Sequence, residues 1–173
     1  MKTVKKRSVK KPSYRPRQPF WPVALTFTLA LYLTILPMPD WPWDYRPPWT
    51  VLAVLFWCFA APRRVGILTA FVVGLMLDVL TGALLGQHAL ALSVTAYLAL
   101  VLRPRIRIFP QWQQTFFVAL ILLTERLLTL WIIAATGQTM PALTYWISAL
   151  VGLAFWPIMA WLLVPFERRL GMS

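Results

Sequence analysis

Six apolar runs, joined by connections too short to hold a soluble domain, constrain the fold more than any other feature of this sequence. Of the 173 residues, 60% are hydrophobic and only 13% are charged. Soluble domains are typically about 45–50% apolar and about 25% charged, so this excess indicates a membrane protein. The sequence therefore predicts an all-α integral membrane protein with six transmembrane helices, over residues 20–36, 49–61, 65–80, 88–102, 115–135 and 142–165.

The basic residues predict how these helices are oriented. Cytoplasmic loops carry an excess of Lys and Arg, and every one of the 17 lysines and arginines except Arg46 and Arg126 can be placed on one side of the membrane. We therefore expect a multi-pass membrane protein with both termini in the cytoplasm. Anionic lipids or cytoplasmic partners would meet its basic loops, which contain Arg63, Arg64, Arg103, Arg105 and Arg107.

This placement divides the chain into three parts. Residues 1–19 are basic, rich in proline and without apolar periodicity, and are expected to form a disordered cytoplasmic tail. Residues 20–166 form the predicted transmembrane domain, and residues 167–173 a short cytoplasmic C-terminus. The first run is interpreted as a retained helix, because Pro37-Met38-Pro39 is not a small-residue cleavage site. The net charge of +12 does not indicate nucleic-acid binding, since no module for that purpose is visible.

The second run, Trp49–Ala61, is the weakest candidate for a membrane span. At 1.5 Å per residue it covers only about 20 Å of a hydrocarbon core that is roughly 30 Å thick. It is either a re-entrant segment or a short crossing helix. Arg63 and Arg64 follow at once and favour a crossing.

Small residues recur at every fourth position between Arg63 and Leu92, and a helix with that spacing carries a groove for close packing. A four-residue repeat drifts by about 40° per step, so the two ends of the groove should face different neighbours. Asp78 is the ionisable member of this repeat, and an ionisable residue in a membrane segment is a candidate functional residue. Asp78 can equally cap a neighbouring turn, and both interpretations stay open. The repeat consists of Gly66, Ala70, Gly74, Asp78, Gly82 and Gly86.

Glu125 and Arg126 lie near the middle of the fifth run. Adjacent helical residues diverge by about 100°, so we do not expect the two side chains to pair easily with each other alone. At least one must face the protein interior or a partner helix. The sequence does not choose between these two roles.

No enzyme, metal or cofactor is predicted. His88 and Asp78 are too few ligands for a metal site, and Cys58 is the only cysteine. The sequence contains neither a GxSxG nucleophile motif nor a GxxxxGK[ST] phosphate loop. Ser148 and Gly152 are interpreted as packing residues.

Four motifs resemble the MreD family of rod shape-determining proteins, and the resemblance covers essentially the whole chain. They are RPPW at residues 46–49, W-x(4)-P-x-R-V-G from Trp57 to Gly66, G-x(3)-D-x(3)-G-x(3)-G from Gly74 to Gly86, and WQQ at residues 112–114. The resemblance implies a non-enzymatic component of the bacterial inner membrane that belongs to the cell-elongation machinery and binds the bitopic protein MreC. Such a component would help to maintain rod shape and to direct peptidoglycan synthesis. MreB, RodA and the transpeptidase partner of RodA would belong to the same complex, and a homo-oligomer is left open.

The family is also similar to the substrate-binding S subunits of energy-coupling-factor transporters, which are six-helix bundles. That similarity implies an alternative function as a small-molecule-binding or transport subunit. On the first interpretation, Gly66, Ala70 and Gly74 set close helix approach, while Asp78 and Glu125 supply directional contacts to partner helices. Gly82, Gly86, His88 and Arg126 complete the set of expected packing and partner residues, and an acidic residue in the fifth span is familiar in the family.

Overall fold

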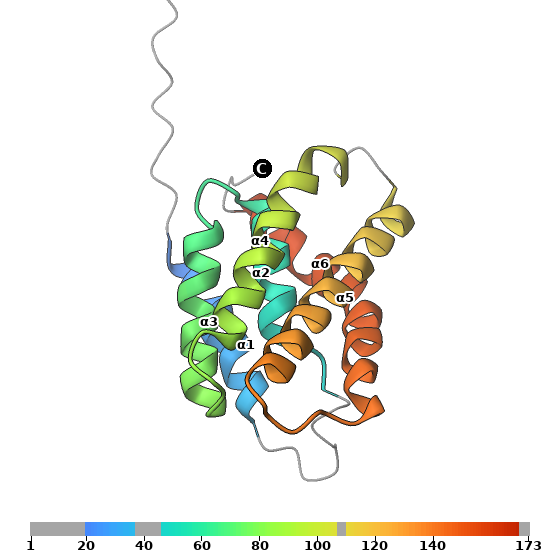
Figure 1. Cartoon of the computed structure of the whole chain (residues 1–173). Helices are drawn as coiled ribbons and strands as arrows, with labels where there is room; N and C mark the ends of the chain where they lie inside the picture. Colours follow the sequence, from blue (N-terminus) through green and yellow to red (C-terminus); the bar gives the residue numbers. More distant parts are fainter. Residues whose placement is uncertain (1–19, 37–45, 107–109, 170–173) are drawn as a thin grey trace, which may run out of the picture.

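Six α-helices and one 3-10 turn form the described part of the chain, which comprises residues 20–36, 46–106 and 110–169 of a computed structural model (Figure 1). The prediction of an all-α fold is confirmed over these ranges. The predicted tail, most of the first loop, Arg107 and the last four residues lie outside them. The elements are α1 (Trp21–Ile35), α2 (Trp49–Ala60), α3 (Ile67–Thr81), α4 (Gln87–Ile106), α5 (Gln111–Ala135), η2 (Leu143–Trp146) and α6 (Ile147–Arg169).

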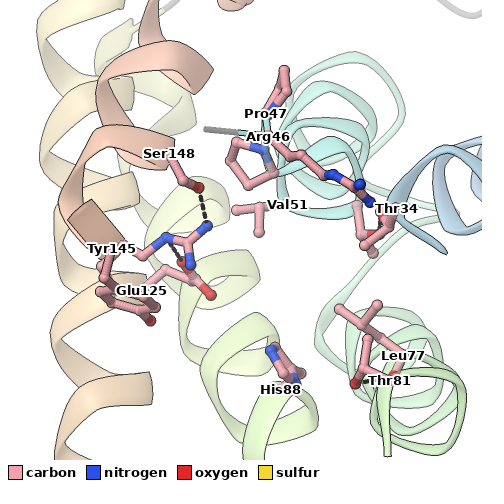
Figure 2. A pocket seen from close by; sticks show the side chains of 13 residues that line it. Thr34, Arg46, Pro47, Val51, Leu77, Thr81, His88, Glu125, Tyr145 and Ser148 are labelled. Atoms are coloured by element: carbon pink, nitrogen blue, oxygen red, sulfur yellow. Dashed lines mark hydrogen bonds and ion pairs between the residues drawn. The ribbon is translucent and has the colours of Figure 1, made fainter. Parts of the chain in front are cut away.

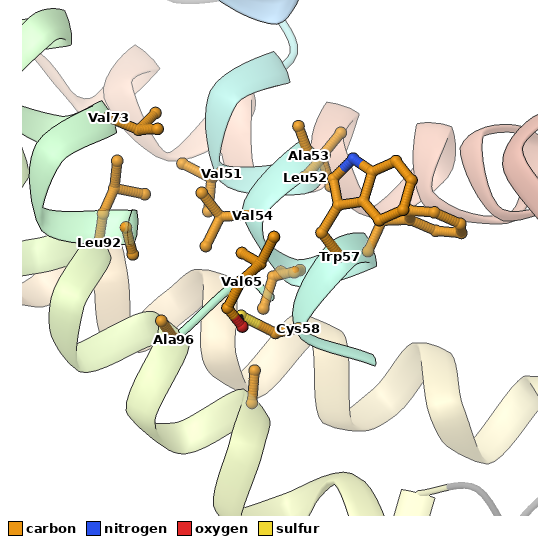
Figure 3. Packing of buried hydrophobic residues seen from close by; sticks show 14 of the residues in the cluster. Val51, Leu52, Ala53, Val54, Trp57, Cys58, Val65, Val73, Leu92 and Ala96 are labelled. Carbon is orange, nitrogen blue, oxygen red and sulfur yellow. Dashed lines mark hydrogen bonds between the residues drawn. The ribbon is translucent and has the colours of Figure 1, made fainter. Parts of the chain in front are cut away.

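The helix α2 forms the centre of the bundle. It contacts α1, α4 and α6, while α3 packs mainly against α4, and α4 also packs against α5. Ten of its residues are buried, including Leu52, Trp57 and Cys58 with no exposed surface (Figure 3). A helix that is apolar all round belongs in such an interior. The indole Nε1 of Trp57 donates a 2.6 Å hydrogen bond to Oγ1 of Thr26 on α1, so the one polar atom of this large side chain has a partner.

This position explains why the second run looked weak as a membrane span. With 12 residues, α2 is about 18 Å long. It is surrounded by other helices and does not have to cover the full thickness of a bilayer with its own surface. Its short length and its complete apolarity therefore have the same cause, which is burial inside the bundle.

The outer surface of the bundle is strongly apolar. Leu68, Val79 and Trp131 are each at least 70% exposed. Among the described residues, only Gln87–Ile106 and Gln113–Ala135 are both long and apolar enough to cross a membrane. The helices α1, α2 and α3 are shorter, with 15, 12 and 15 residues. Exposed apolar surface of this extent marks contact with lipid or with other proteins.

Several predicted helix boundaries need correction. The helix α5 begins at Gln111 instead of residue 115, and α6 continues to Arg169 instead of ending at residue 165. Arg103 and Arg105 were expected in a loop, but α4 continues through Pro104 to Ile106, so both lie in its last turn. Arg103 Nε donates a 2.8 Å hydrogen bond to the carbonyl oxygen of Phe59 in the last turn of α2. The carbonyls at a helix C-terminus lack partners within the helix and attract cations, which explains why the Arg103 side chain lies against the end of α2. The sixth helix begins at Ile147 instead of residue 142, because the 3-10 turn η2 precedes it.

Candidate functional site

The turn between α3 and α4 is organised by Asp78, whose side chain has no exposed surface. Its carboxylate accepts hydrogen bonds from the backbone amides of Gly86 and His88 at 2.8 Å and of Ala89 at 3.3 Å. Nδ1 of His88 lies 2.8 Å from Oδ1, and a carboxylate can only accept, so Nδ1 carries the proton. These amides at the start of α4 have no acceptor within their own helix. Asp78 therefore caps the turn.

Of the two readings of Asp78, capping is the one that the structure supports. Within the chain itself the Asp78 side chain is enclosed, and a contact between Asp78 and a partner helix stays a prediction. Gly82 and Gly86 make the turn possible, since their φ angles of 66° and 101° lie in the region that residues with a Cβ rarely adopt. They belong to the connection and not to a packing groove.

Close helix approach occurs at Gly74, where α3 packs against the start of α4. A Cβ on this residue would lie 2.7 Å from the backbone nitrogen of Ala89. Ala70 on the same helix is fully buried. Gly66, in contrast, precedes α3, and a Cβ there would meet nothing within 4 Å. The expectation that Gly66 sets close approach in the bundle is therefore wrong, because the repeat is interrupted where the helix begins.

Glu125 and Arg126 both reach the interior of the bundle. Arg126 Nη2 donates a 2.6 Å hydrogen bond to Oγ of Ser148, and its guanidinium lies 4.8 Å from the centre of the Tyr145 ring. Glu125 is only 2% exposed and accepts a 3.3 Å hydrogen bond from Thr129. Nε of Arg126 is 3.5 Å from Oε2 of Glu125, so the expectation that neighbours on a helix do not readily pair is wrong here. The long Arg126 side chain bends back far enough to bring the charges together.

A cavity of about 220 Å³, shown in Figure 2, is lined by Glu125, Arg126, Tyr145 and Ser148 together with other residues. Its walls come from all six helices and from η2, mostly from the helix ends that lie away from Arg63 and Arg103. The lining side chains combine charged groups, hydroxyls and a few apolar groups: Thr34, Arg46, Pro47, Pro48, Thr50, Val51, Leu77, Thr81, His88, Glu125, Arg126, Tyr145 and Ser148. The cavity thus joins the two clusters that the sequence had suggested separately, one near Asp78 and His88 and the other at Glu125 and Arg126.

Arg46 was missed as a site residue because it was assigned to a loop exposed on the outer side. It is only 8% exposed, and its Nη1 donates a 2.9 Å hydrogen bond to the carbonyl oxygen of Leu36 just after α1. Nearby, the hydroxyls of Thr34 and Thr50 lie 3.1 Å apart. The sequence did contain a signal: Arg46 is the one basic residue that the charge rule places neither on the cytoplasmic side nor within a helix. Ser148 was missed too, since a membrane serine has no distinguishing pattern.

The cavity lining limits the chemistry that the described residues can supply. Among the described residues, no three His, Cys, Asp or Glu side chains lie close enough together to hold a metal ion. His88 is held by Asp78 and does not approach a serine or cysteine in any hydrogen bond that the structure shows. What the cavity offers is positive charge, one carboxylate and several hydroxyls within an otherwise apolar bundle.

Comparison with known proteins gives a consistent result. A family model described as rod shape-determining protein MreD matches residues 15–165. The rod shape-determining protein MreD of Haemophilus influenzae (strain ATCC 51907 / DSM 11121 / KW20 / Rd) is 35% identical over 102 residues, which are 59% of this chain and 63% of that protein. No solved structure matches the chain.

Proposed function

Because the chain belongs to the MreD family of rod shape-determining proteins, we propose that it is an inner-membrane component of the cell-elongation machinery that binds MreC and helps to direct peptidoglycan synthesis. The match over residues 15–165 is the observation that carries this proposal. The family is a structural, shape-determining one and not a known enzyme family. MreB, RodA and its partner transpeptidase would be further members of the same complex.

The proposed arrangement in the membrane has all six helices crossing and both termini in the cytoplasm. Arg63 and Arg64 in the α2–α3 turn and Arg103 and Arg105 at the end of α4 support it, because they lie at the same end of the bundle (Figure 1). The short α1 and α3 would cross with their ends close to the headgroups, and a bilayer thins locally around such helices. Exposed apolar side chains such as Leu68 and Trp131 would then face lipid or partner helices.

The contact with MreC would use this outer surface, because Asp78 and Glu125 are enclosed by their own chain. Helices in lipid associate through close van der Waals packing of their surfaces and not through the hydrophobic effect. A photo-crosslinking residue at Met76, beside an apolar groove between α1 and α3, and another at Leu127 on α5 would identify the contacting face.

The test is depletion of the protein in its source cell together with purification of the tagged chain. We expect the depleted cells to become round and wide and MreC to co-purify with the chain. Rod-shaped cells after depletion, combined with the absence of MreC from the purified material, would overturn the proposal.

A small-molecule-binding subunit is the second candidate, and the polar cavity is the observation that favours it. Similarity to transporter S subunits stays a prediction from the sequence resemblance. Saturable binding of a vitamin by the purified chain would support this candidate. A panel of vitamins and lipid precursors without any saturable binding would count against it.

A further inference from the structure

One end of the bundle has a large surplus of positive charge. Of the 17 lysines and arginines, all fifteen other than Arg46 and Arg126 lie before α1, between α2 and α3, from the last turn of α4 to the start of α5, or at the end of α6. Glu167 is the one acidic residue in these segments. Because one carboxylate side chain neutralises only one cation, the rest of this charge has to be balanced from outside the chain.

Two of these arginines, Arg63 and Arg105, have exposed side chains. Neither side chain forms a hydrogen bond or an ion pair with the part of the chain that the structure describes. They lie on adjoining elements, because Arg103, two residues before Arg105, donates its hydrogen bond to Phe59, four residues before Arg63. The α2–α3 turn and the last turn of α4 thus present two guanidinium groups at the same end of the bundle (Figure 1).

Exposed apolar side chains adjoin both arginines. Leu68, which is 77% exposed, lies in the first turn of α3 directly after the α2–α3 turn. Val101, which is 55% exposed, precedes Arg105 by four residues on the same face of α4. An acidic soluble protein would match the charges but would bring a polar surface against these apolar side chains. A phospholipid matches both, because its phosphate accepts hydrogen bonds from a guanidinium while its acyl chains cover the apolar side chains.

We propose that the α2–α3 turn and the last turn of α4 form a binding site for an anionic phospholipid, whose phosphate contacts Arg63 and Arg105 and whose acyl chains lie against Leu68 and Val101. A zwitterionic headgroup is disfavoured there, because the surplus of positive charge repels its ammonium group. Each arginine near anionic headgroups strengthens binding by about fivefold. The site does not depend on the contact with MreC, so either proposal can fail without the other.

The experiment compares an anionic and a zwitterionic headgroup on the same acyl chains. Full-length protein in detergent binds a fluorescent phosphatidylglycerol, and unlabelled phosphatidylglycerol or phosphatidylethanolamine competes with it while fluorescence anisotropy measures the bound fraction. We expect phosphatidylglycerol to compete about 30-fold more effectively, which is the product of the two arginine contributions. This preference should shrink as the salt concentration is raised, because ions screen the attraction between exposed charges.

Two single variants and their combination assign the preference to this site. Arg63→Gln and Arg105→Gln should each weaken phosphatidylglycerol binding about fivefold and together about 30-fold, while the affinity for phosphatidylethanolamine stays unchanged. Thr139→Arg, added to the double variant, is the matched control. It returns one positive charge at the exposed α5–η2 connection, at the opposite end of the bundle, and should restore no affinity. Thermal unfolding without added lipid checks the fold of each variant, and the comparison of lipids in the unaltered chain depends on no variant.

Three results would each overturn the proposal. Equal competition by the two lipids would show that this end of the bundle does not select headgroups by charge, and would leave an acidic protein surface as the partner of the two arginines. A preference that survives in the double variant would place the lipid elsewhere on the chain. Recovery of affinity through Thr139→Arg would make the preference an effect of net charge and not of this site.

Discussion

Gly74 of α3 packs directly against the backbone of Ala89 in α4: a Cβ on residue 74 would lie 2.7 Å from the Ala89 nitrogen and 2.8 Å from the carbonyl oxygen of His88. Both neighbours are backbone atoms and cannot turn aside as a flexible side chain can. The two helices therefore meet at a distance that only glycine permits. Gly74 lies four residues before Asp78 on α3, so close packing and the capped turn fix the same pair of helices.

We expect Gly74→Ala to lower the free energy of unfolding by about 1–3 kcal/mol, the usual cost of overpacking a tight contact. Thermal unfolding of the detergent-solubilised protein measures the change. Gly66→Ala is the matched control, because a Cβ at residue 66 would meet nothing within 4 Å. Equal melting temperatures for the two variants would show that the α3–α4 contact can relax without cost.

Asp78→Asn should destabilise the protein by about 1.5–3 kcal/mol, since the neutral side chain replaces charge-assisted hydrogen bonds to the start of α4. The NH₂ group of the asparagine side chain would also face backbone N–H groups, which cannot accept a hydrogen bond from it. Hydrogen exchange at the amides of Gly86 and His88 should accelerate along with the loss of stability. Thr28→Val, which removes an exposed hydroxyl bonded within its own helix, is the control and should leave both quantities unchanged.

Arg103→Gln should cost about 1 kcal/mol, because the bond from its Nε caps a terminal carbonyl of the central helix α2. Arg105→Gln removes the same charge from an exposed position two residues further along α4. Equilibrium unfolding should therefore separate the two variants, although both change the charge at the end of α4 equally. If the two lose the same stability, the effect comes from the overall charge and not from the cap.

The proposed membrane arrangement predicts which turns are accessible from outside the cell. In a Cys58→Ala background, Thr139→Cys in the α5–η2 connection should react with a membrane-impermeant maleimide on intact cells, while Arg63→Cys should react only after permeabilisation. Because Cys58 is the one cysteine of the chain, this background leaves only the introduced thiol to react. Labelling in the reverse order would invert the orientation.

The sequence predicted those parts of the fold that depend on apolar runs. The positions of the helices follow from such runs, because burial and lipid contact demand apolar side chains over whole segments. The end of α4 was misjudged, since Arg103-Pro104-Arg105 reads as a loop. What overrides that pattern is a contact across the bundle, between Arg103 and the carbonyl of Phe59, which no local pattern encodes.

The site was predicted only in pieces. Asp78, His88, Glu125 and Arg126 stood out because ionisable groups are costly in an apolar segment. Their common cavity depends on how α4 packs against α5. Arg46 forms part of the cavity wall, where a hydrogen bond to Leu36 holds its side chain. Arg46 is separated by 79 positions from Glu125 in the sequence. Pairings of this kind arise from tertiary structure and leave no periodic signal.

The enclosed position of α2 has a consequence for how the protein is made. A helix of 12 residues is too short to bridge about 30 Å of hydrocarbon unaided, so in the proposed arrangement it would not be a stable resident of the bilayer when it leaves the ribosome. Its neighbours α1, α4 and α6 supply the surroundings that it needs, and α4 and α6 are synthesised later. Membrane insertion of this chain is then a cooperative event completed only after the sixth helix has emerged, and truncation before that point should leave a product for quality-control proteases.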